Sequence, residues 1–202
     1  MRAAPRVVLV NLSPELGKAF RAIGFLTDDI LLVPDLDAAL ETCEDAIIEA
    51  AQRARGEAKS LHEWLAEACG NDEYAGYLAK QCVRVEVAPG DIIARQGDPA
   101  DALHFILDGR IGIMVDTGDH QIRVRSLRSH TTVGEMGLIT GQPRNATIRA
   151  ETRGILYALS LSAYERIKVE NPAAALALLG YIIRVMSERL SFANRVVGVL
   201  QR

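Results

Sequence analysis

Alternation of apolar and polar positions divides the chain into three stretches, of which the first covers residues 1–52. Short apolar runs, VVLV at 7–10 and DILLV at 29–33, predict two strands. Each run is followed by a helical pattern, and Ser13 suits the start of the first helix. Two strands and two helices seldom bury enough apolar surface to be stable alone, so this stretch predicts only part of an α/β domain.

The second stretch begins as a polar helical pattern and then changes to a period of two. Residues 53–82, with Trp64 and Leu65 on one face, predict a connecting helix packed on the next domain. Turn signals separate the short strands predicted after it: VRVEV, DIIA, LHFIL, RIGIMV, QIRVRSL, ATIRA and ILYALS. Strands at this spacing, with no long helix between them, predict a small barrel or roll over residues 83–160.

The helical period returns in residues 161–202. LSAYERIKVE predicts one helix, which ends before Pro172, and the segment after it predicts a longer helix that reaches the C-terminus. One face of the long helix mixes apolar with small residues, so we expect it to pack in more than one position: Leu176, Leu179, Ile183, Met186 and Leu190. The predicted class is α+β: a jelly-roll-like β-roll with flanking helices, preceded by a partial α/β segment.

Composition argues against several classes of protein. The net charge of −3 speaks against a nucleic-acid binder, which usually shows a basic face. Three cysteines without a C-x-x-C pair and four scattered histidines predict neither a disulfide framework nor a metal site, and they fit a reducing cytoplasm. The longest apolar run, residues 173–183, falls short of a bilayer span. Paired carboxylates and a nucleophile elbow are lacking, so we expect no enzyme.

The segment GEMGLITGQPRNATIRA at 134–150 combines a permissive backbone with charged residues. Gly134, after the strand HTTV, permits a tight bend before a short helix whose first N–H groups point toward an anion. Gly137 leaves room for close approach, and Arg144 brings a planar set of donors for a phosphate-like group. Glu135 would repel a phosphate but accepts well from hydroxyls. The predicted ligand is therefore an anion joined to a sugar.

A simpler interpretation of the same loop is open at this point. Gly-Glu and Pro-Arg turns are common, and Glu135 and Arg144 could form an ion pair across the loop. The residues alone do not decide between a ligand site and a structural ion pair.

This loop and the preceding segment RQGDPADALHFILDGRIGI resemble the cyclic nucleotide-binding domain, over roughly residues 80–202. The resemblance implies a β-roll that binds cAMP, with Glu135 accepting from the ribose 2′-hydroxyl and Arg144 pairing with the cyclic phosphate. It implies these residues around the ligand: Gly134, Glu135, Met136, Gly137, Leu138, Arg144, Asn145 and Ala146. Asn145 replaces the family's Ser, Thr or Ala, which weakens the case for cGMP, the alternative ligand.

Residues 1–52 resemble the closing half of a STAS domain, most clearly in PDLDAALETCED. STAS followed by a cyclic nucleotide-binding domain is an arrangement at the cytosolic end of SulP-type anion transporters, and it also occurs in some long bacterial glutaminases. The segment RSHTTVGEMGL is more similar to the transporter type than to the glutaminase type. The resemblance therefore implies a membrane transporter domain, in the same or a partner chain, at the cytosolic face of the inner membrane.

Two functions are consistent with these patterns. The leading hypothesis is a regulatory module in which a cyclic nucleotide binds the loop and the last helices swing to a second position. On the last helix, Phe192 could stack on the base or pack in the core, and Asn194 lies nearby in the sequence. The rival is a structural interaction module with the same fold that binds no nucleotide. A homodimer is left open, and no nucleic-acid partner is expected.

Overall fold

The computed structural model describes residues 7–27, 30–33, 36, 39–40, 43, 47, 59–118 and 120–200, with residues 192 and 195–200 described by their backbone alone. The chain divides into two compact units, Met1–Ala58 and Lys59–Arg202. The residues from Lys59 to 82, which the sequence assigned to a helical linker over 53–82, thus lie within the second unit.

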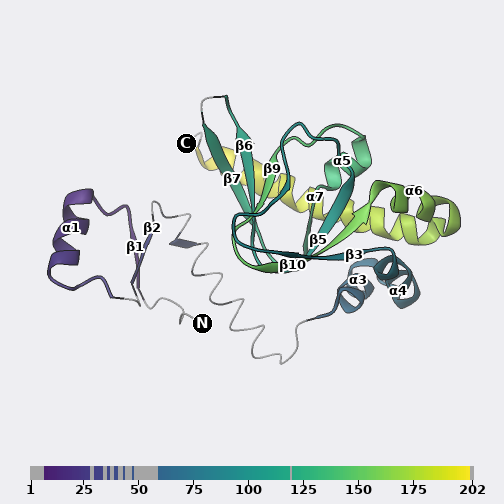
Figure 1. The fold of residues 1–202 in the computed structure, drawn as a ribbon, viewed down its shortest axis with the longest axis horizontal. Coiled ribbons are helices and arrows are strands. Elements are labelled where there is room, and N and C mark those ends of the chain that lie inside the picture. Colours follow the sequence, from purple (N-terminus) through teal and green to yellow (C-terminus); the bar gives the residue numbers. More distant parts are fainter. Residues whose placement is uncertain are drawn as a thin grey trace. The chain divides into compact units, whose positions relative to one another are not determined.

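In the first unit a helix connects two parallel strands (Figure 1). β1 (Val7–Val10) pairs in parallel with β2 (Ile30–Val33), and α1 (Pro14–Ala22) lies between them in the chain. The Ser13 hydroxyl caps α1 by accepting from the backbone N–H of Leu16. Both predicted strands and the first predicted helix are confirmed. The second predicted helix lies largely outside the described residues.

The two-stranded sheet of the first unit leaves apolar side chains exposed. Val7 and Val10 on β1 and Leu31 and Leu32 on β2 each expose more than a third of their surface. Parallel strands are normally buried on both faces. Within the described residues this sheet therefore has the character expected of part of a larger one.

Two helices open the second unit. α3 (Leu61–Cys69) ends at Gly70, whose φ of 66° is left-handed, and α4 (Asp72–Lys80) follows directly. The sequence predicted one connecting helix here, and the left-handed glycine divides it into two. Trp64 and Leu65 are buried, as their shared face predicted.

Two four-stranded sheets form a β-roll, in the orders β3-β10-β5-β8 and β4-β9-β6-β7. All pairs within them are antiparallel. The strands are β3 (Val83–Val87), β4 (Ile92–Ala94), β5 (Ala102–Asp108), β6 (Ile111–Asp116), β7 (Gln121–Leu127), β8 (Thr131–Val133), β9 (Thr147–Ala150) and β10 (Gly154–Ser160). Every strand predicted from the period of two is present, which confirms the β-roll.

Two further helices close the second unit. α6 (Leu161–Glu170) begins at Ser160, whose hydroxyl accepts from the backbone N–H of Ala163. α7 (Pro172–Leu200) follows after a break at Asn171 and runs alongside the sheets (Figure 1). Both helices match the prediction. None of the helices in the described part of the chain combines the length and the apolar character that crossing a membrane requires.

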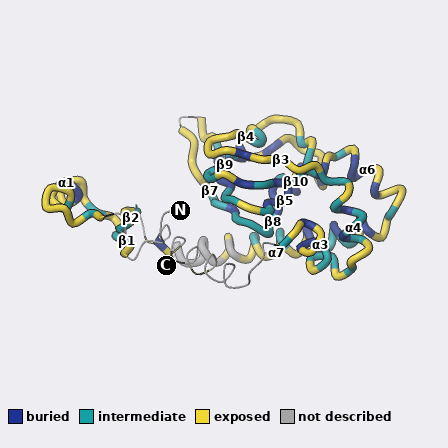
Figure 2. The backbone as a smooth tube through the Cα atoms, turned by 60° about the horizontal axis from the view of Figure 1, so that its bottom comes forward, coloured by how far each residue is buried: buried dark blue, intermediate teal, exposed yellow. Residues whose placement is uncertain are grey.

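Two hydrophobic clusters hold the second unit together, and Figure 2 shows the buried positions in dark blue. The first cluster joins the helices to one sheet through side chains with no exposed surface: Leu65, Leu78, Phe105, Leu159, Ile167, Leu178 and Ile182. The second fills the roll: Val87, Ile106, Ile111, Leu127, Val133, Ile148, Ala150 and Leu156. Each large apolar side chain buried in this way contributes about 1.5–3 kcal/mol. The short helix α5 (Glu135–Thr140) is anchored on the first cluster by Leu138.

Candidate functional site

The segment at 134–146, which we refer to as the cassette, has the predicted bend, short helix and return. Gly134 caps α5 with a φ of 85°, and Gly141 ends it with a φ of 66°. A Cβ at Gly134 would overlap the guanidinium of Arg144, so the arginine packs directly on this bend. A Cβ at Gly137 would overlap the Cβ of Ala100. The space beside Gly137 that the sequence assigned to a ligand is therefore filled by Ala100.

Arg144 is held in the protein interior, with a side chain only 3% exposed. Its Nη2 donates to the backbone oxygen of Ala102 at 2.6 Å and to Oδ1 of Asp101 at 3.0 Å, and its Nη1 donates to the backbone oxygen of Gly134 at 3.2 Å. These contacts join the start of β5 to the start of α5. The guanidinium is thus fixed at the bend of the cassette.

Glu135 is also buried, and its partner comes from the last helix. Oε1 of Glu135 accepts from Nη1 of Arg189 on α7 at 2.5 Å. Nη2 of Arg189 donates to Oγ1 of Thr131 at 3.0 Å and to the backbone oxygen of Thr132 at 2.5 Å. One arginine therefore ties α7 to both β8 and the cassette.

The ion pair between Glu135 and Arg144, which the sequence left open, is not what the structure shows. Glu135 pairs with Arg189 and Arg144 pairs with Asp101. The specific pair in the simpler interpretation is therefore wrong, although each of the two residues forms an ion pair with another side chain. The carboxylate and the guanidinium are instead two separately held groups of opposite charge.

The other predicted residues of the cassette differ in how far their side chains are buried. Met136 and Asn145 are exposed and touch each other, since the Asn145 amide lies 3.4 Å from Sδ of Met136. Ala146 is half-buried. Leu138 is buried in the first hydrophobic cluster, so its side chain supports the cassette from the core side.

The two candidate base contacts lie on α7. Asn194 is exposed. The side chain of Phe192 lies outside the described part of the structure, so stacking on a base and packing in the core both stay predictions.

Some buried polar atoms at the cassette have no hydrogen-bond partner within the described structure. Oε2 of Glu135 is an acceptor of this kind, and Nε of Arg144 is a donor of this kind. Buried polar groups are nearly always hydrogen-bonded, so each such atom needs an explanation. Together they fit a ligand that offers hydroxyl donors to the carboxylate and anionic acceptors to the guanidinium, which is the chemistry of a sugar phosphate.

A neutral histidine lies beside Arg144. His104 on β5 is buried, and burial together with the positive charge of Arg144 lowers the pKa of His104 to about 4. The ring is therefore uncharged at neutral pH, which avoids a second buried positive charge next to Arg144.

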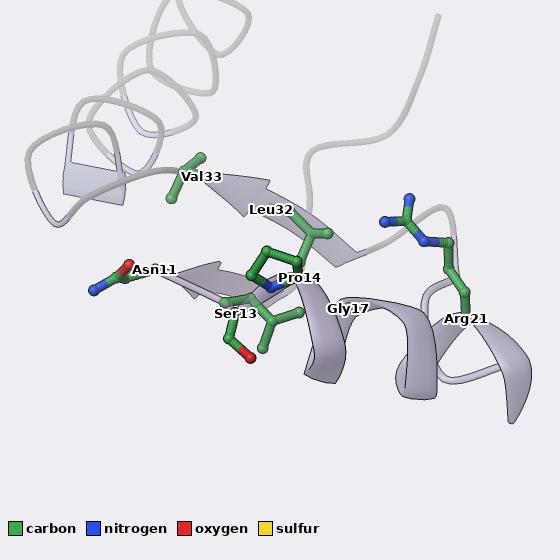
Figure 3. A pocket seen from close by; sticks show the side chains of 8 residues that line it. Asn11, Ser13, Pro14, Gly17, Arg21, Leu32 and Val33 are labelled. Atoms are coloured by element: carbon green, nitrogen blue, oxygen red, sulfur yellow. The ribbon is translucent and has the colours of Figure 1, made fainter.

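A separate hollow of about 400 Å³ lies in the first unit, at the start of α1 (Figure 3). Its lining is mixed: Pro14, Leu32 and Val33 are apolar, Asn11 and Ser13 are polar, and Arg21 is charged. Arg21 is exposed, and no buried polar side chain points to a ligand there. This hollow therefore does not compete with the cassette as a candidate site.

Two residues that hold the site, Arg189 and Asp101, were not among those predicted from the sequence. Asp101 lies 43 positions before Arg144, and Arg189 lies 54 positions after Glu135, so no local motif links either pair. The available signal for Arg189 was its position in a helix that is apolar over much of its length. Pairing partners this distant depend on the folded roll and cannot be read from spacing.

Several known proteins are similar to this chain. A profile of the cyclic nucleotide-binding domain family matches residues 84–171. Glutaminase 1 of Bradyrhizobium diazoefficiens is 29% identical over 172 residues, which cover 82% of this chain and 27% of that protein. The cAMP-dependent protein kinase type II regulatory subunit of Drosophila melanogaster is 34% identical over 92 residues, which cover 45% of this chain and 24% of that protein.

A solved structure shares the fold. The crystal structure of a cyclic nucleotide-binding domain from Methylobacillus flagellatus KT matches with a TM-score of 0.63 at 20% identity, over 68% of this chain and 83% of that one. This chain spans about a quarter of the length of the two curated relatives.

The comparisons also bear on the expected context of the domain. The similarity to glutaminase 1 covers 82% of the chain and so extends beyond the second unit into the first. None of these findings supports a STAS domain or a SulP transporter. The family match at 84–171 contains residues of every β-roll strand and the complete cassette. Residues 84–171 of this chain are a cyclic nucleotide-binding domain.

Proposed function

We propose that the second unit is a regulatory module that senses a cyclic nucleotide, cAMP rather than cGMP, and that α7 transmits the binding event. The observation that carries this proposal is the pairing of Glu135 with Arg189, because it connects a predicted ligand residue to the last helix. In this proposal the residues of this chain bind and signal, and they carry no catalysis of their own.

In this proposal Arg144 pairs with the phosphate group of the cyclic nucleotide. Its Nη atoms donate to two backbone oxygens and to Asp101, whose side chain is 82% exposed. An exposed carboxylate is a weak partner compared with a buried one, so a cyclic phosphate can replace Asp101 at low cost. The two backbone contacts keep the guanidinium in place while that exchange occurs.

Glu135 is the proposed acceptor for the ribose hydroxyl. Its Oε1 is paired with Arg189 and its Oε2 is buried without a partner in the described structure. A hydroxyl that donates to this carboxylate competes with Arg189. The ligand then shifts the equilibrium between the docked and the released positions of α7. The size of this shift is set by the difference between the ligand's affinities for the two states.

Asn145 supports the choice of cAMP. The resemblance implies that a threonine hydroxyl at this position assists the binding of cGMP, whereas the Asn145 amide lies against the sulfur of Met136. The amide can still donate to a phosphate oxygen.

The regulated partner is proposed to be a glutaminase catalytic region, in the same or an associated chain. Two relatives, glutaminase 1 and glutaminase 2 of Bradyrhizobium diazoefficiens, are each similar over 82% of this chain. This context replaces the transporter that the sequence analysis placed first, because nothing in the comparisons supports a transporter.

Titration calorimetry of the full chain with cAMP and with cGMP tests the proposal. We expect cAMP to bind and cGMP to bind more weakly. Arg144→Lys should weaken cAMP binding about tenfold or more, since an ammonium lacks the planar fork, and Glu135→Gln should cost about 1–2 kcal/mol. Arg153→Lys, at a side chain 85% exposed, is the matched control and should bind as the unaltered chain does.

Arg144→Ala is a poorer test of the same site. It should cost roughly 2–5 kcal/mol of binding. However, the same change removes three internal hydrogen bonds of Arg144, so lower stability would accompany it. If the unaltered chain bound neither nucleotide, the rival function, a structural module with this fold, would be the correct one.

A further inference from the structure

The first strand of the β-roll, β3, forms an open edge. Within the described part of the chain β3 pairs with β10 alone, and it ends the sheet order β3-β10-β5-β8. The backbone N–H and C=O groups on the other side of an edge strand are a template for pairing with a further strand. Val83, at the start of β3, is 67% exposed although it is apolar. This edge therefore offers both backbone groups and an apolar side chain to a partner.

The side chains of β3 alternate between charged and apolar. Arg84 and Glu86 lie on one side of the strand, with side chains 48% and 55% exposed, and Nη1 of Arg84 donates to Oε1 of Glu86 at 2.6 Å. Val85 and Val87 lie on the other side and pack in the second hydrophobic cluster. The edge thus has a charged outer side and an apolar inner side.

The strand sequence VRVEV is self-complementary when two copies of it run antiparallel. If Val85 lies opposite Val85 of a second copy, each Arg84 lies opposite the other copy's Glu86. The Cβ atoms of directly opposite residues are about 4.5–5.5 Å apart, and opposite charges at that spacing attract each other. The same register places the exposed Val83 opposite Val87 of the second copy. One register therefore pairs both charges and covers the exposed valine.

The edge strand β7 of the other sheet lacks this property. β7 ends the order β4-β9-β6-β7 and exposes an apolar residue, Val124, to 63%. Antiparallel pairing about Val124 would place Arg123 opposite Arg125 of a second copy, and like charges directly opposite each other are destabilising. Charged residues commonly protect edge strands in this way. β3, with one residue of each sign, has no such protection against a second copy of itself.

One further charged side chain lies near Glu86. Nη2 of Arg153 is 3.8 Å from Oε2 of Glu86. Arg153 directly precedes β10, so it approaches β3 from the paired side and not from the open edge. Its side chain is 85% exposed, and it therefore does not obstruct a strand that pairs with the open edge.

We propose that two copies of this chain associate through their β3 edges around a twofold axis, so that their β3-β10-β5-β8 sheets join into one continuous sheet. A twofold contact requires a self-complementary surface, which VRVEV provides. A strand of five residues buries little surface, so the association is weak and its register depends on the ion pairs. The proposal involves no residue of the cassette or of α7 and does not depend on nucleotide binding.

Sedimentation velocity of charge-reversed full chains over about 1–100 μM tests the proposal, because association of this kind depends on concentration. Arg84→Glu alone and Glu86→Arg alone each place like charges opposite each other, so each should associate at least about tenfold more weakly than the unaltered chain. An equal mixture of the two variants restores both pairs of opposite charge and should associate as the unaltered chain does. Association through any other surface is the same in all samples, so the differences report on β3.

The ion pair between Lys168 and Glu165 on α6 provides the matched control, since these side chains are 44% and 54% exposed. Lys168→Glu and Glu165→Lys, separately and mixed, should associate as the unaltered chain does. A mixture of the β3 variants that associates no more strongly than either variant alone overturns the proposal. So does an unaltered chain that associates no more strongly than the single β3 variants.

Cysteine cross-linking provides a test that does not depend on reversed charges. Cys43, which is exposed, and Cys82, which directly precedes β3, are first replaced by serine. In that background Arg84→Cys mixed with Glu86→Cys, with copper phenanthroline as the oxidant, should give more disulfide-linked dimer than either variant alone. Only the mixture places two cysteines opposite each other and keeps one ion pair.

The control for the cross-linking is a mixture of Lys168→Cys and Glu165→Cys in the same background. This mixture should give no more linked dimer than its separate variants. If the β3 mixture gave no excess of linked dimer over the α6 mixture, the proposal would be overturned.

Discussion

At the scale of single residues, Gly134 and Arg144 depend on each other. The left-handed bend at Gly134 leaves the space that the guanidinium occupies, and Nη1 of Arg144 donates back to the oxygen of the same glycine. The sequence predicted the bend, because glycine between a strand and a short helix is a strong signal. It did not predict that the arginine would fill the bend, since that contact depends on Ala102 from another strand.

Gly134→Ala should lower the free energy of unfolding by more than Gly141→Ala. Both glycines have a left-handed φ, so alanine costs about 1–2 kcal/mol at either position. A Cβ at Gly141 meets nothing within 4 Å, whereas a Cβ at Gly134 displaces Arg144. The further loss at Gly134 should be about 1–3 kcal/mol, measured by urea unfolding. Equal losses for the two variants would contradict the packing described here.

His104 should make stability fall in mild acid. Because burial and Arg144 lower the pKa of His104 to about 4, the folded state holds the neutral ring, while the unfolded chain takes up a proton below about 6.5. The stabilising effect is present above pH 6.5 and is lost as the pH falls toward 4, by up to about 3 kcal/mol.

Urea unfolding at several pH values checks this expectation. His104→Gln should flatten the decline between about pH 6.5 and 4, where the difference between folded and unfolded pKa acts. His120→Gln, at an exposed position, should leave the slope as it is. An unchanged slope in His104→Gln would mean that other groups cause the decline.

At the scale of elements, periodicity predicted most of the structure. In β3 the more buried positions alternate with exposed ones, as the sequence indicates, whereas β5 is buried at four consecutive positions and was identified by its short apolar run. The division of one predicted helix into α3 and α4 was missed, because a glycine inside a helical pattern signals a break only when its backbone turns left-handed, as Gly70 does. The contact between α7 and the cassette was missed because one pair, Arg189 with Glu135, forms it across 54 positions.

Arg189→Met should raise the affinity for cAMP and lower stability. The change removes the competitor of the ribose hydroxyl and leaves the Glu135 carboxylate buried without its partner, which costs about 3–5 kcal/mol when one side of a buried pair is removed. Arg184→Met is the control, since Arg184 lies on the same helix and contacts Ala68 instead of the cassette. Calorimetry and urea unfolding provide the measurements.

Hydrogen exchange adds a structural readout for the same variant. Amides of 172–190 should exchange faster in Arg189→Met than in Arg184→Met, because the tie between α7 and β8 is lost. If Arg189→Met bound cAMP more weakly, Arg189 would be a ligand contact and the competition described above would be wrong.

At the scale of the whole molecule, the two units differ in how completely they bury their apolar residues. The second unit has two clusters with many fully buried side chains. In the first unit, Leu16, Ile23 and Phe25 are among the exposed large apolar residues. The sequence predicted this contrast, since two strands and two helices form too small a core.

Removing residues 1–58 should leave the thermal midpoint of the second unit unchanged, because the two clusters draw their residues from Leu61 onward. Calorimetry of the full chain and of the 59–202 fragment provides the comparison. The fragment should also bind less of the apolar dye ANS, since it lacks the exposed apolar residues of the first unit. A midpoint lowered by several degrees would show that the first unit supports the second.

The unbroken length of α7 has a mechanical consequence. Ile182 is the last fully buried residue among the described side chains of α7 and would be the fulcrum of a tilt, with Arg189 about 10 Å and Leu200 about 27 Å further along the rod at 1.5 Å per residue. A rigid rod that turns about such a fulcrum magnifies displacement in proportion to distance. A shift of about 2 Å at Arg189 would then become about 5 Å at Leu200, so α7 would amplify a displacement at the cassette about two and a half times.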